Sequence, residues 1–200
     1  MTLAIVDYGV GNLGSVGRAF RRLGVDFQLT SDPEEIRRAD FLVLPGVGNF
    51  GESMRNLRER YLERPIREAL DRGGRLLGIC VGFQMLFDKS EEAPGVPGLG
   101  LLRGEVKGFG PELVVPHVGW NQLEALRNEP LLEGVAPGEC FYFLHSYYAV
   151  AGDEGVVWAS TEYGGRFCSV AGAGPVSGIQ FHPEKSQAAG LRLLSNFVNS

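Results

Sequence analysis

The sequence predicts an α/β fold with three layers: a mostly parallel sheet, helices on both of its faces, and an antiparallel-rich C-terminal half. Up to Ser90, short apolar runs alternate with segments of helical period, which is typical of a parallel sheet. The run FLVLPG (41–46) is apolar almost throughout, as expected for a strand covered on both faces. After Pro94, short strand-like runs separated by glycine and proline indicate the antiparallel half.

The expected elements follow in chain order. Strands are expected over 3–8, 25–30, 41–46 and 75–80, and helices over 15–24, 32–39, 52–74 and 81–90. Gly24 closes the first helix, Asp32 is the expected N-cap of the second, and the third is interrupted near Pro65. A last helix is expected at 186–200. Because no linker or repeat interrupts this pattern, we expect one domain over residues 1–200.

Composition excludes several classes of protein. The formal net charge of -5 argues against a nucleic-acid binder, which needs a basic face. No apolar run approaches the roughly 18 residues that span a membrane, and MTLAIVDYG has neither a basic n-region nor a cleavage site. Three irregularly spaced cysteines form no disulfide framework. We therefore expect a cytoplasmic protein that binds neither nucleic acid nor membrane.

The segment GVGNLG (9–14) matches G-x-G-x-x-G, follows an expected strand and opens an expected helix, as a dinucleotide fingerprint would. However, Asp7 and Tyr8 separate the apolar run from the first glycine. Asp32, which could contact a ribose, is explained equally well as a helix cap. The favoured interpretation is a loop at the carboxyl edge of the sheet, where ligands or partners bind.

Cys80 stands in GICVG, where an expected strand meets an expected helix. This is the layout of a nucleophile elbow, whose sharp turn needs small residues two positions before and after, here Gly78 and Gly82. The N-terminus of the following helix would favour the thiolate. The alternative is a buried structural thiol, which needs no such glycines. Cys140 and Cys168 lie inside strand-like runs and are expected in the core.

A thiol nucleophile needs a base, and His182 in the segment FHPE is the candidate. Pro183 ends the strand directly after the histidine, which places the imidazole at the edge of the sheet. Glu184 can turn back to hold one ring nitrogen and leave the other for the thiol. The sequence thus predicts a triad of Cys80, His182 and Glu184.

An oxyanion hole would complete such a site. The N–H of Val81 directly follows the nucleophile, and the loop containing Gly46, Val47 and Gly48 offers a second donor beside it. Its glycines could let the loop rotate between active and inactive states, although a plain glycine turn remains the alternative. His117 and His145 could be metal ligands with Cys80, but without a closely spaced His/Cys pair we predict no metal, and we expect no cofactor.

These motifs together resemble the class I glutamine amidotransferases, through G-x-C-x-G-x-Q at 78–84 and FHPE at 181–184. Narrower features are similar to one family among them, the glutaminase subunits of imidazole glycerol phosphate synthase in histidine biosynthesis. These features are DYGVGNLGSV, PGVGNFG, PHVGWN, LHSYY and HPEKS. The resemblance runs from residue 3 to the last helix and implies the class I glutamine amidotransferase fold, which is flavodoxin-like.

The resemblance also implies roles for individual residues. Cys80 would attack the side-chain amide of glutamine, His182 would pass a proton to the leaving ammonia, and Glu184 would orient His182. A glutamyl thioester would then be hydrolysed to glutamate. Substrate contacts are expected from Gln84, one helical turn beyond the nucleophile, and from His145, Ser146 and Tyr147.

A partner follows from the same resemblance: a (β/α)8-barrel cyclase that uses the ammonia to form imidazole glycerol phosphate and aminoimidazole carboxamide ribotide. Free ammonia would escape or be protonated in water, so it should pass directly between the two chains of a heterodimer. Interface candidates are Asn12, His117, Trp120, Asn121 and Lys185. Trp120 could equally be a core aromatic.

Three other functions remain as alternatives. The glutaminase subunit of pyridoxal phosphate synthase has a similar length, but its oxyanion loop does not look like PGVG and it lacks a counterpart of PHVGWN. A catalytically silent docking module would not need the intact triad. A standalone esterase or peptidase would turn over activated esters without a partner and without a special response to glutamine.

Overall fold

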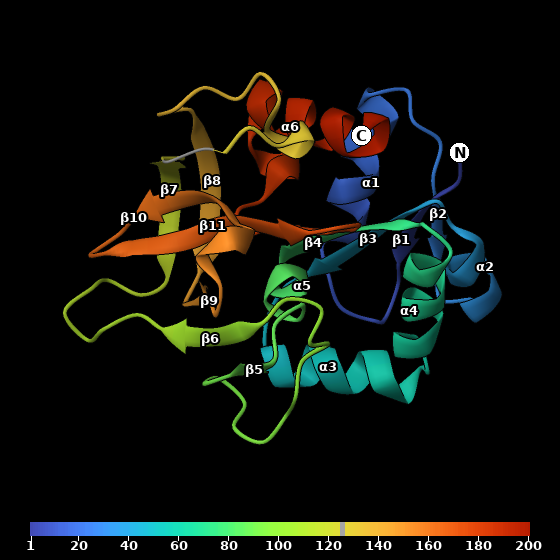
Figure 1. The fold of residues 1–200 in the computed structure, drawn as a ribbon, viewed down its shortest axis with the longest axis horizontal. Coiled ribbons are helices and arrows are strands. Elements are labelled where there is room, and N and C mark those ends of the chain that lie inside the picture. Colours follow the sequence, from blue (N-terminus) through green and yellow to red (C-terminus); the bar gives the residue numbers. More distant parts are fainter. Residues whose placement is uncertain (125–126) are drawn as a thin grey trace.

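A computed structural model describes residues 1–124 and 127–200 and contains one large mixed sheet with helices packed on it (Figure 1). The parallel half of the sheet contains, in spatial order, β2 (Gln28–Thr30), β1 (Leu3–Val6), β3 (Phe41–Gly46), β4 (Arg75–Cys80) and β12 (Val176–Ile179). The sheet continues through β11 (Arg166–Ala173), β9 (Tyr147–Ala151), β6 (Gly104–Gly108) and β5 (Lys89–Ser90), with β10 (Val157–Glu162) also pairing with β11. A separate antiparallel pair consists of β7 (His117–Gln122) and β8 (Cys140–His145).

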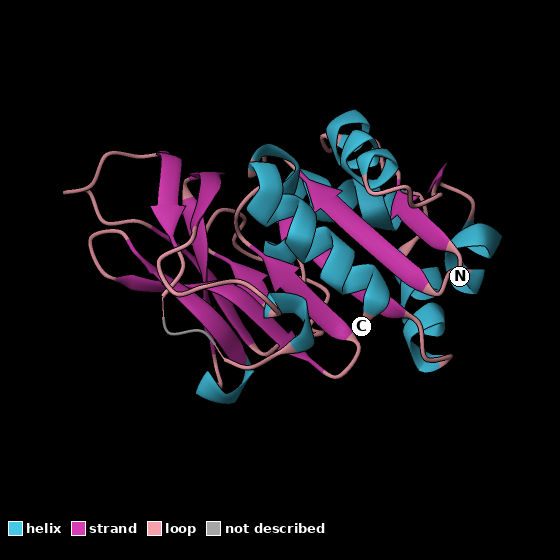
Figure 2. Cartoon of the chain, turned by 90° about the horizontal axis from the view of Figure 1, so that it is seen from above, coloured by secondary structure: helices cyan, strands magenta, loops and turns pink. Residues whose placement is uncertain are grey.

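Helices cover both faces of the parallel half. On one face lie α1 (Leu13–Arg22) and α6 (Gln187–Asn199), and on the other lie α3 (Phe50–Glu59) and α5 (Val81–Gln84) (Figure 1). At the β2 end, α2 (Pro33–Arg38) packs against α4 (Glu63–Asp71). Short 3-10 helices cover Pro130–Leu132, Glu154–Val156 and Pro183–Lys185. Figure 2 shows that the half of the molecule with the antiparallel strands consists mostly of strands and loops. The predicted three-layer α/β fold with an antiparallel-rich C-terminal half is confirmed.

The central strands are apolar because helices shield both of their faces. Every residue of β1 is buried, and in β3 only Phe41 is partly exposed. A strand with one solvated face would instead alternate apolar and polar residues. The sheet runs without interruption from its parallel to its antiparallel half. One domain over residues 1–200 stays a prediction.

The helix predicted over 52–74 is interrupted, as predicted, but the break lies at residues 60–62, just before Pro65. Between α3 and α4, Tyr61 has φ 58°, a left-handed conformation that no α-helix continues through. Pro65 instead lies in the first turn of α4, where a missing N–H is harmless because those groups have no helical acceptor.

The helix predicted over 81–90 ends after about one turn, and its last two residues form β5 instead. The carbonyl groups of Met85, Leu86 and Phe87 accept hydrogen bonds from backbone N–H groups of residues 99–102. That loop therefore takes the place of the next helical turn. The strand predicted over 25–30 is shorter as well, because the Val25 N–H donates to the Phe20 carbonyl at 3.0 Å and closes α1.

The carboxyl ends of the parallel strands position the candidate site. In the register of the sheet, Gly46 of β3 lies opposite Cys80 of β4, and β12 pairs with the other side of β4. Asp32 caps α2 by accepting the Glu34 N–H at 2.8 Å, as predicted. No helix in the described part of the chain is long and apolar enough to cross a membrane.

Candidate active site

Cys80 occupies a strained turn between β4 and α5. Its φ of 56° and ψ of -110° lie in a region that side-chain-bearing residues rarely adopt. A Cβ atom added to Gly78 would lie 2.7 Å from the Gly82 carbonyl oxygen, and one added to Gly82 would collide with the Leu44 carbonyl. Both flanking positions therefore exclude side chains, for the packing reason that the sequence analysis proposed. The thiol itself is 3% exposed.

His182 and Glu184 lie directly beyond β12, on the side of Cys80. The Nδ1 atom of His182 lies 2.9 Å from Oε1 of Glu184, and both side chains are buried. Asn12 donates from Nδ2 to the same Oε1 at 3.3 Å, so this predicted interface residue reaches the candidate triad. The other carboxylate oxygen of Glu184, Oε2, is buried and has no hydrogen-bond partner among the described residues. The His182 imidazole is therefore the main group that compensates the Glu184 carboxylate.

The Cys80 thiol and the Glu184 carboxylate are the two groups that act on the His182 imidazole, and Cys80 and His182 line the same pocket. Burial lowers the pKa of His182, but the neighbouring Cys80 sulfur and the Glu184 carboxylate outweigh this effect, so the pKa of His182 is raised. The site therefore favours a protonated imidazole beside the Cys80 sulfur and the Glu184 carboxylate. Such a pair activates a cysteine as a nucleophile and provides the acid for its leaving group.

A pocket of about 240 Å³ opens beside the thiol. The predicted site residues Cys80, His182, Val47, Gly48, Val81, Gln84, His145, Ser146 and Tyr147 all line it. Gly46 is not among the residues that line the pocket. A Cβ atom added to Gly46 would lie 2.8 Å from the Cβ atom of Val81. Gly48 has φ +89°, and neither its N–H nor that of Val47 has an acceptor among the described residues.

The substrate-contact residues differ in what they offer to this pocket. Gln84 is buried, and its Nε2 donates to the Tyr147 carbonyl at 2.8 Å and to Oε1 of Gln180 at 3.1 Å. Both ring nitrogens of His145 are engaged within the chain, at 2.8 Å from the Tyr147 carbonyl and 3.0 Å from His117. His145 is thus part of the pocket wall and not a second base for Cys80.

Comparison with known proteins identifies the family. The family model "Glutamine amidotransferase class-I" matches residues 4–200. The chain is 50% identical over 202 residues to "Imidazole glycerol phosphate synthase subunit HisH" of Geobacillus kaustophilus, covering 98% of this chain and 95% of that protein. The protein of the same name from Moorella thermoacetica is 50% identical over 195 residues, covering 98% and 93%. The chain belongs to the HisH family of class I glutamine amidotransferases.

Membership in the HisH family confirms the predicted enzyme class, glutamine amidotransferase, and the predicted role as the glutaminase subunit of a histidine-biosynthetic synthase. Solved structures agree on the fold alone. The "Crystal structure of glutamine amidotransferase" has a TM-score of 0.77 at 24% identity and covers 98% of this chain and 97% of that one. The "Structure of PurLQS from Thermotoga maritima" has a TM-score of 0.76 at 20% identity, covering 99% and 97%.

Sequence reasoning missed two polar residues of this HisH site. Gln180 is fully buried, and its Nε2 lies 3.8 Å from the Cys80 sulfur. It precedes His182 by two residues, and the two-residue period of extended chain, which places both on one side, could have indicated it. Glu92 also lines the pocket, and its Oε2 accepts the Phe50 N–H at 2.7 Å. It stands in a loop with no recognisable motif.

The remaining interface candidates lie on or behind the β7–β8 pair. Trp120 is 49% exposed and contacts Tyr142 across the strands, with ring centroids 6.2 Å apart. The Lys185 Nζ atom lies over the ring of Tyr142, 5.5 Å from the ring centroid. His117 is 4% exposed and points inward, so its side chain cannot contact a partner directly. Asn121 binds His117 and the Glu162 carbonyl instead of projecting freely.

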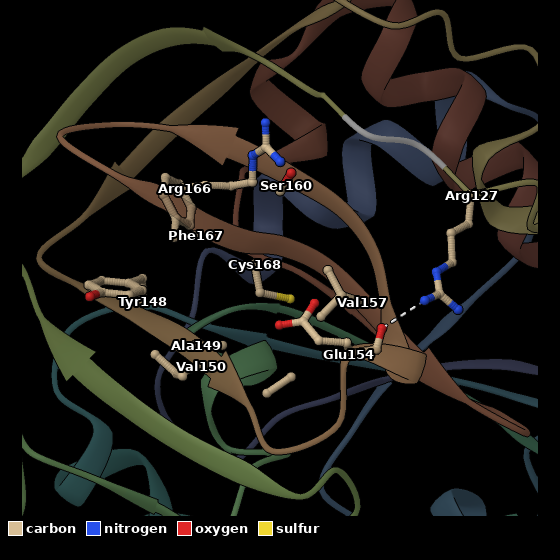
Figure 3. A pocket seen from close by; sticks show the side chains of 11 residues that line it. Arg127, Tyr148, Ala149, Val150, Glu154, Val157, Ser160, Arg166, Phe167 and Cys168 are labelled. Carbon is tan, nitrogen blue, oxygen red and sulfur yellow. Dashed lines mark hydrogen bonds between the residues drawn. The ribbon is translucent and has the colours of Figure 1, made fainter.

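A larger cavity, of about 530 Å³, lies away from this site among β9, β10 and β11 (Figure 3). Its guanidinium groups are already engaged: Arg127 donates to the Glu154 and Gly155 carbonyls, and Arg166 pairs with Glu124. Burial raises the pKa of Cys168 there to about 12, so this thiol is not a nucleophile at neutral pH. Within residues 1–124 and 127–200, no group of three or more His, Cys, Asp or Glu could hold a metal.

Proposed function

We propose that this HisH chain hydrolyses glutamine with Cys80, His182 and Glu184, and passes the ammonia to a (β/α)8-barrel cyclase in the cytoplasm. One observation carries the proposal. A thiol on a strained turn shares a small pocket with a histidine that a buried carboxylate orients.

In the proposed reaction, the Cys80 thiolate attacks the amide carbon of the glutamine side chain and forms a C–S bond. The protonated His182 gives its proton to the amide nitrogen, the C–N bond breaks, and ammonia leaves. His182 then takes a proton from a water molecule, whose oxygen attacks the thioester and releases glutamate and the thiolate. Glu184 holds Nδ1 throughout, so that Nε2 remains directed at the thiol.

The oxyanion of each tetrahedral intermediate would be stabilised by backbone N–H groups. Val81 lies at the N-terminus of α5, where a helical N–H has no helical acceptor. Val47 and Gly48, which line the same pocket, contribute N–H groups without acceptors among the described residues. Gly46 permits the close approach of that loop to α5.

The pocket is suited to a small amino acid. Glu92 is the carboxylate in its wall apart from the triad, and we assign it to the α-ammonium group of glutamine. The backbone of residues 145–147 would receive the α-carboxylate. Gln84 would act mainly through Tyr147, because its amide nitrogen is already shared between two acceptors.

The exposed face of the β7–β8 pair is the proposed docking surface for the cyclase. Val118, Trp120, Leu144 and Tyr142 lie on this face as cross-strand neighbours, and three of them are among the exposed large hydrophobic residues. The surface borders the active site, because the Tyr142 carbonyl accepts the His182 N–H at 2.9 Å. Ammonia released at Cys80 would thus leave beside the partner. Lys185 and Asn12 lie near the same border.

Covalent trapping tests the assignment of the nucleophile. The purified chain would be incubated with a glutamine analogue carrying an electrophilic ketone in place of the amide, and analysed by intact and peptide mass spectrometry. We expect one adduct, on Cys80, that glutamine competes away, while Cys140 and Cys168 stay unmodified. Cys140 was predicted in the core but is exposed, because it stands at the start of β8. Labelling of Cys140 instead of Cys80, unaffected by glutamine, would refute the assignment.

A further inference from the structure

A continuous chain of side-chain hydrogen bonds runs from β7 to the wall of the glutamine pocket. Asn121 Nδ2 lies 3.2 Å from Nε2 of His117, and Nδ1 of His117 lies 3.0 Å from Nε2 of His145. Nδ1 of His145 lies 2.8 Å from the Tyr147 carbonyl oxygen. The two histidines are directly opposite each other in the β7–β8 register, and both are buried.

Hydrogen-bond chemistry fixes every proton in this chain. The Tyr147 carbonyl can only accept, so Nδ1 of His145 carries a hydrogen. Burial lowers the pKa of His145 to about 3 and that of His117 to about 4, so both rings are neutral near pH 7. Nε2 of His145 must then accept from Nδ1–H of His117, whose Nε2 accepts from the Asn121 amide. Both histidines are therefore Nδ1–H tautomers.

The far end of this chain shapes the active site. His145 ends β8 and Tyr147 begins β9, so the bond from the imidazole to the Tyr147 carbonyl closes the turn around Ser146. All three residues of the turn line the pocket. The same carbonyl accepts the Gln84 amide at 2.8 Å, which ties the turn to the helix that follows the nucleophile. Rotation of the His145 ring would break its bond to this carbonyl and leave Gln84 as the carbonyl's remaining side-chain partner.

The near end of the chain holds His117 rigidly. Its ring stacks on Tyr163, with centroids 4.0 Å apart and planes 23° from parallel, and on Phe143, at 5.0 Å and 25°. Asn121 is anchored in turn, because it also donates to the Glu162 carbonyl at 3.0 Å. His117 thus has one orientation in which to donate to His145.

We propose that His117 is a positioning residue for glutamine hydrolysis: by donating to His145, it fixes the turn of residues 145–147 that binds glutamine. His117 touches neither glutamine nor Cys80, so it is not a catalytic residue. The proposal rests on the proposed function of the pocket. It assigns the PHVGWN segment a role inside the chain, in addition to the docking role of its outward residues.

The proton order is tested first, by ¹⁵N NMR of the imidazole rings in the full-length chain at neutral pH. We expect His117 and His145 to show protonated Nδ1 and unprotonated Nε2, the reverse of the preference of free histidine. The Nδ1 proton of His117 should exchange slowly with water. A His117 ring protonated at Nε2, or one in rapid tautomer exchange, overturns the proposal. This outcome does not depend on activity.

Two variants then separate hydrogen bonding from packing. His117→Phe keeps a stacked ring but removes the donor, and we expect the KM for glutamine to rise about tenfold while kcat changes less. His117→Asn places an amide N–H near the position of Nδ1 and should restore most of the affinity. Equal losses in both variants, or an unchanged KM in His117→Phe, overturn the proposal. A wild-type chain without Cys80-dependent glutaminase activity would instead refute the proposed function, and the NMR result would still decide the proton order.

Discussion

The backbone of Cys80 is the most strained feature of the site. A side-chain-bearing residue at φ 56° and ψ -110° costs on the order of 1–3 kcal/mol, and the packing of Gly78 and Gly82 against neighbouring backbone maintains it. The strain lifts the sulfur out of the sheet toward His182 and the pocket. Glu184 then determines which imidazole nitrogen faces the sulfur.

The roles of these residues predict unequal effects of substitution. Glu184→Gln should lower kcat by about 10²–10⁴-fold, because an amide oxygen can still accept from Nδ1 but provides no charge. Cys80→Ala should reduce glutamate release to background, because no other group can form the thioester. Steady-state rates with glutamine measure both, with circular dichroism to verify folding. Equal losses would contradict the separation of roles.

How far the sequence predicts the site depends on where the interacting residues lie along the chain. The triad prediction relied on two short motifs whose glycines and proline have local physical reasons. Gln180 and Glu92 were missed because their contacts with Cys80 and Phe50 join segments far apart in sequence. The inward orientation of His117 was missed for the same reason, since only the pairing of β7 with β8 reveals it.

Among the elements, the loop between β3 and α3 is the one that we propose to supply the oxyanion-hole donors. It is anchored at its start, where the Tyr8 hydroxyl donates to the Pro45 carbonyl at 2.6 Å in the buried interior. Beyond this anchor, Val47 is 39% exposed and Gly48 has a positive φ. We therefore predict that a reorientation of the N–H groups would be confined to residues 46–48.

A matched pair of variants tests this loop. Gly48 (φ +89°) and Gly73 (φ +92°) have no atoms near an added Cβ, so alanine at either position should cost about 1 kcal/mol of stability through backbone strain alone. Only Gly48→Ala should change the glutaminase rate, since Gly73 follows α4 far from the pocket. Urea unfolding and glutamate release measure the two effects. An equal rate change in Gly73→Ala would show that the loop has no special role.

Periodicity predicted the elements of the core better than their ends. Strands β1, β3 and β4 follow from continuous apolar runs, because both of their faces are covered. The end of α5 was unpredictable from local sequence, since hydrogen bonds from residues 99–102 terminate it. Pro65 correctly indicated an interruption nearby, but the break itself is centred on Tyr61, where no glycine or proline marks it.

The whole molecule combines a buried active site with an exposed apolar face beside it. We predict that Trp120→Ala changes the free energy of unfolding by less than about 0.5 kcal/mol but weakens binding to the cyclase at least about tenfold. The control is Leu29→Ala in β2, an edge strand of the large sheet. Leu29 is 50% exposed and Trp120 is 49% exposed, so the two substitutions remove similarly exposed side chains. Calorimetric titration with the cyclase measures both, and equal binding by both variants would place the docking surface elsewhere.

The buried histidines make the stability of the fold depend on pH. Burial lowers the pKa of His117 and His145 from 6.5 to about 4 and about 3, so the unfolded chain binds more protons below pH 6.5. The contribution of the two neutral rings to the free energy of unfolding is complete above pH 6.5. It declines as the pH falls, by up to about 1.4 kcal/mol per pH unit for each ring. The raised pKa of His182 has the opposite sign and acts above pH 6.5.

Urea unfolding between pH 6.5 and 5 should therefore show a stability that falls with pH, and less steeply in His117→Phe, which has one fewer titrating ring. The carboxylates with lowered pKa, such as Glu63 and Glu68, respond mainly below this window. An equal slope in the wild type and the variant would contradict the buried, neutral state of His117.

The most direct test of the whole account is glutamate release from glutamine by the purified chain, alone and with the cyclase subunit and its nucleotide substrate, with Cys80→Ala as control. We predict release that requires Cys80 and increases sharply when the partner and its substrate are present, because they stabilise the productive state of the loop at residues 46–48. Release that persists in Cys80→Ala, or that is absent under all conditions, would contradict the account.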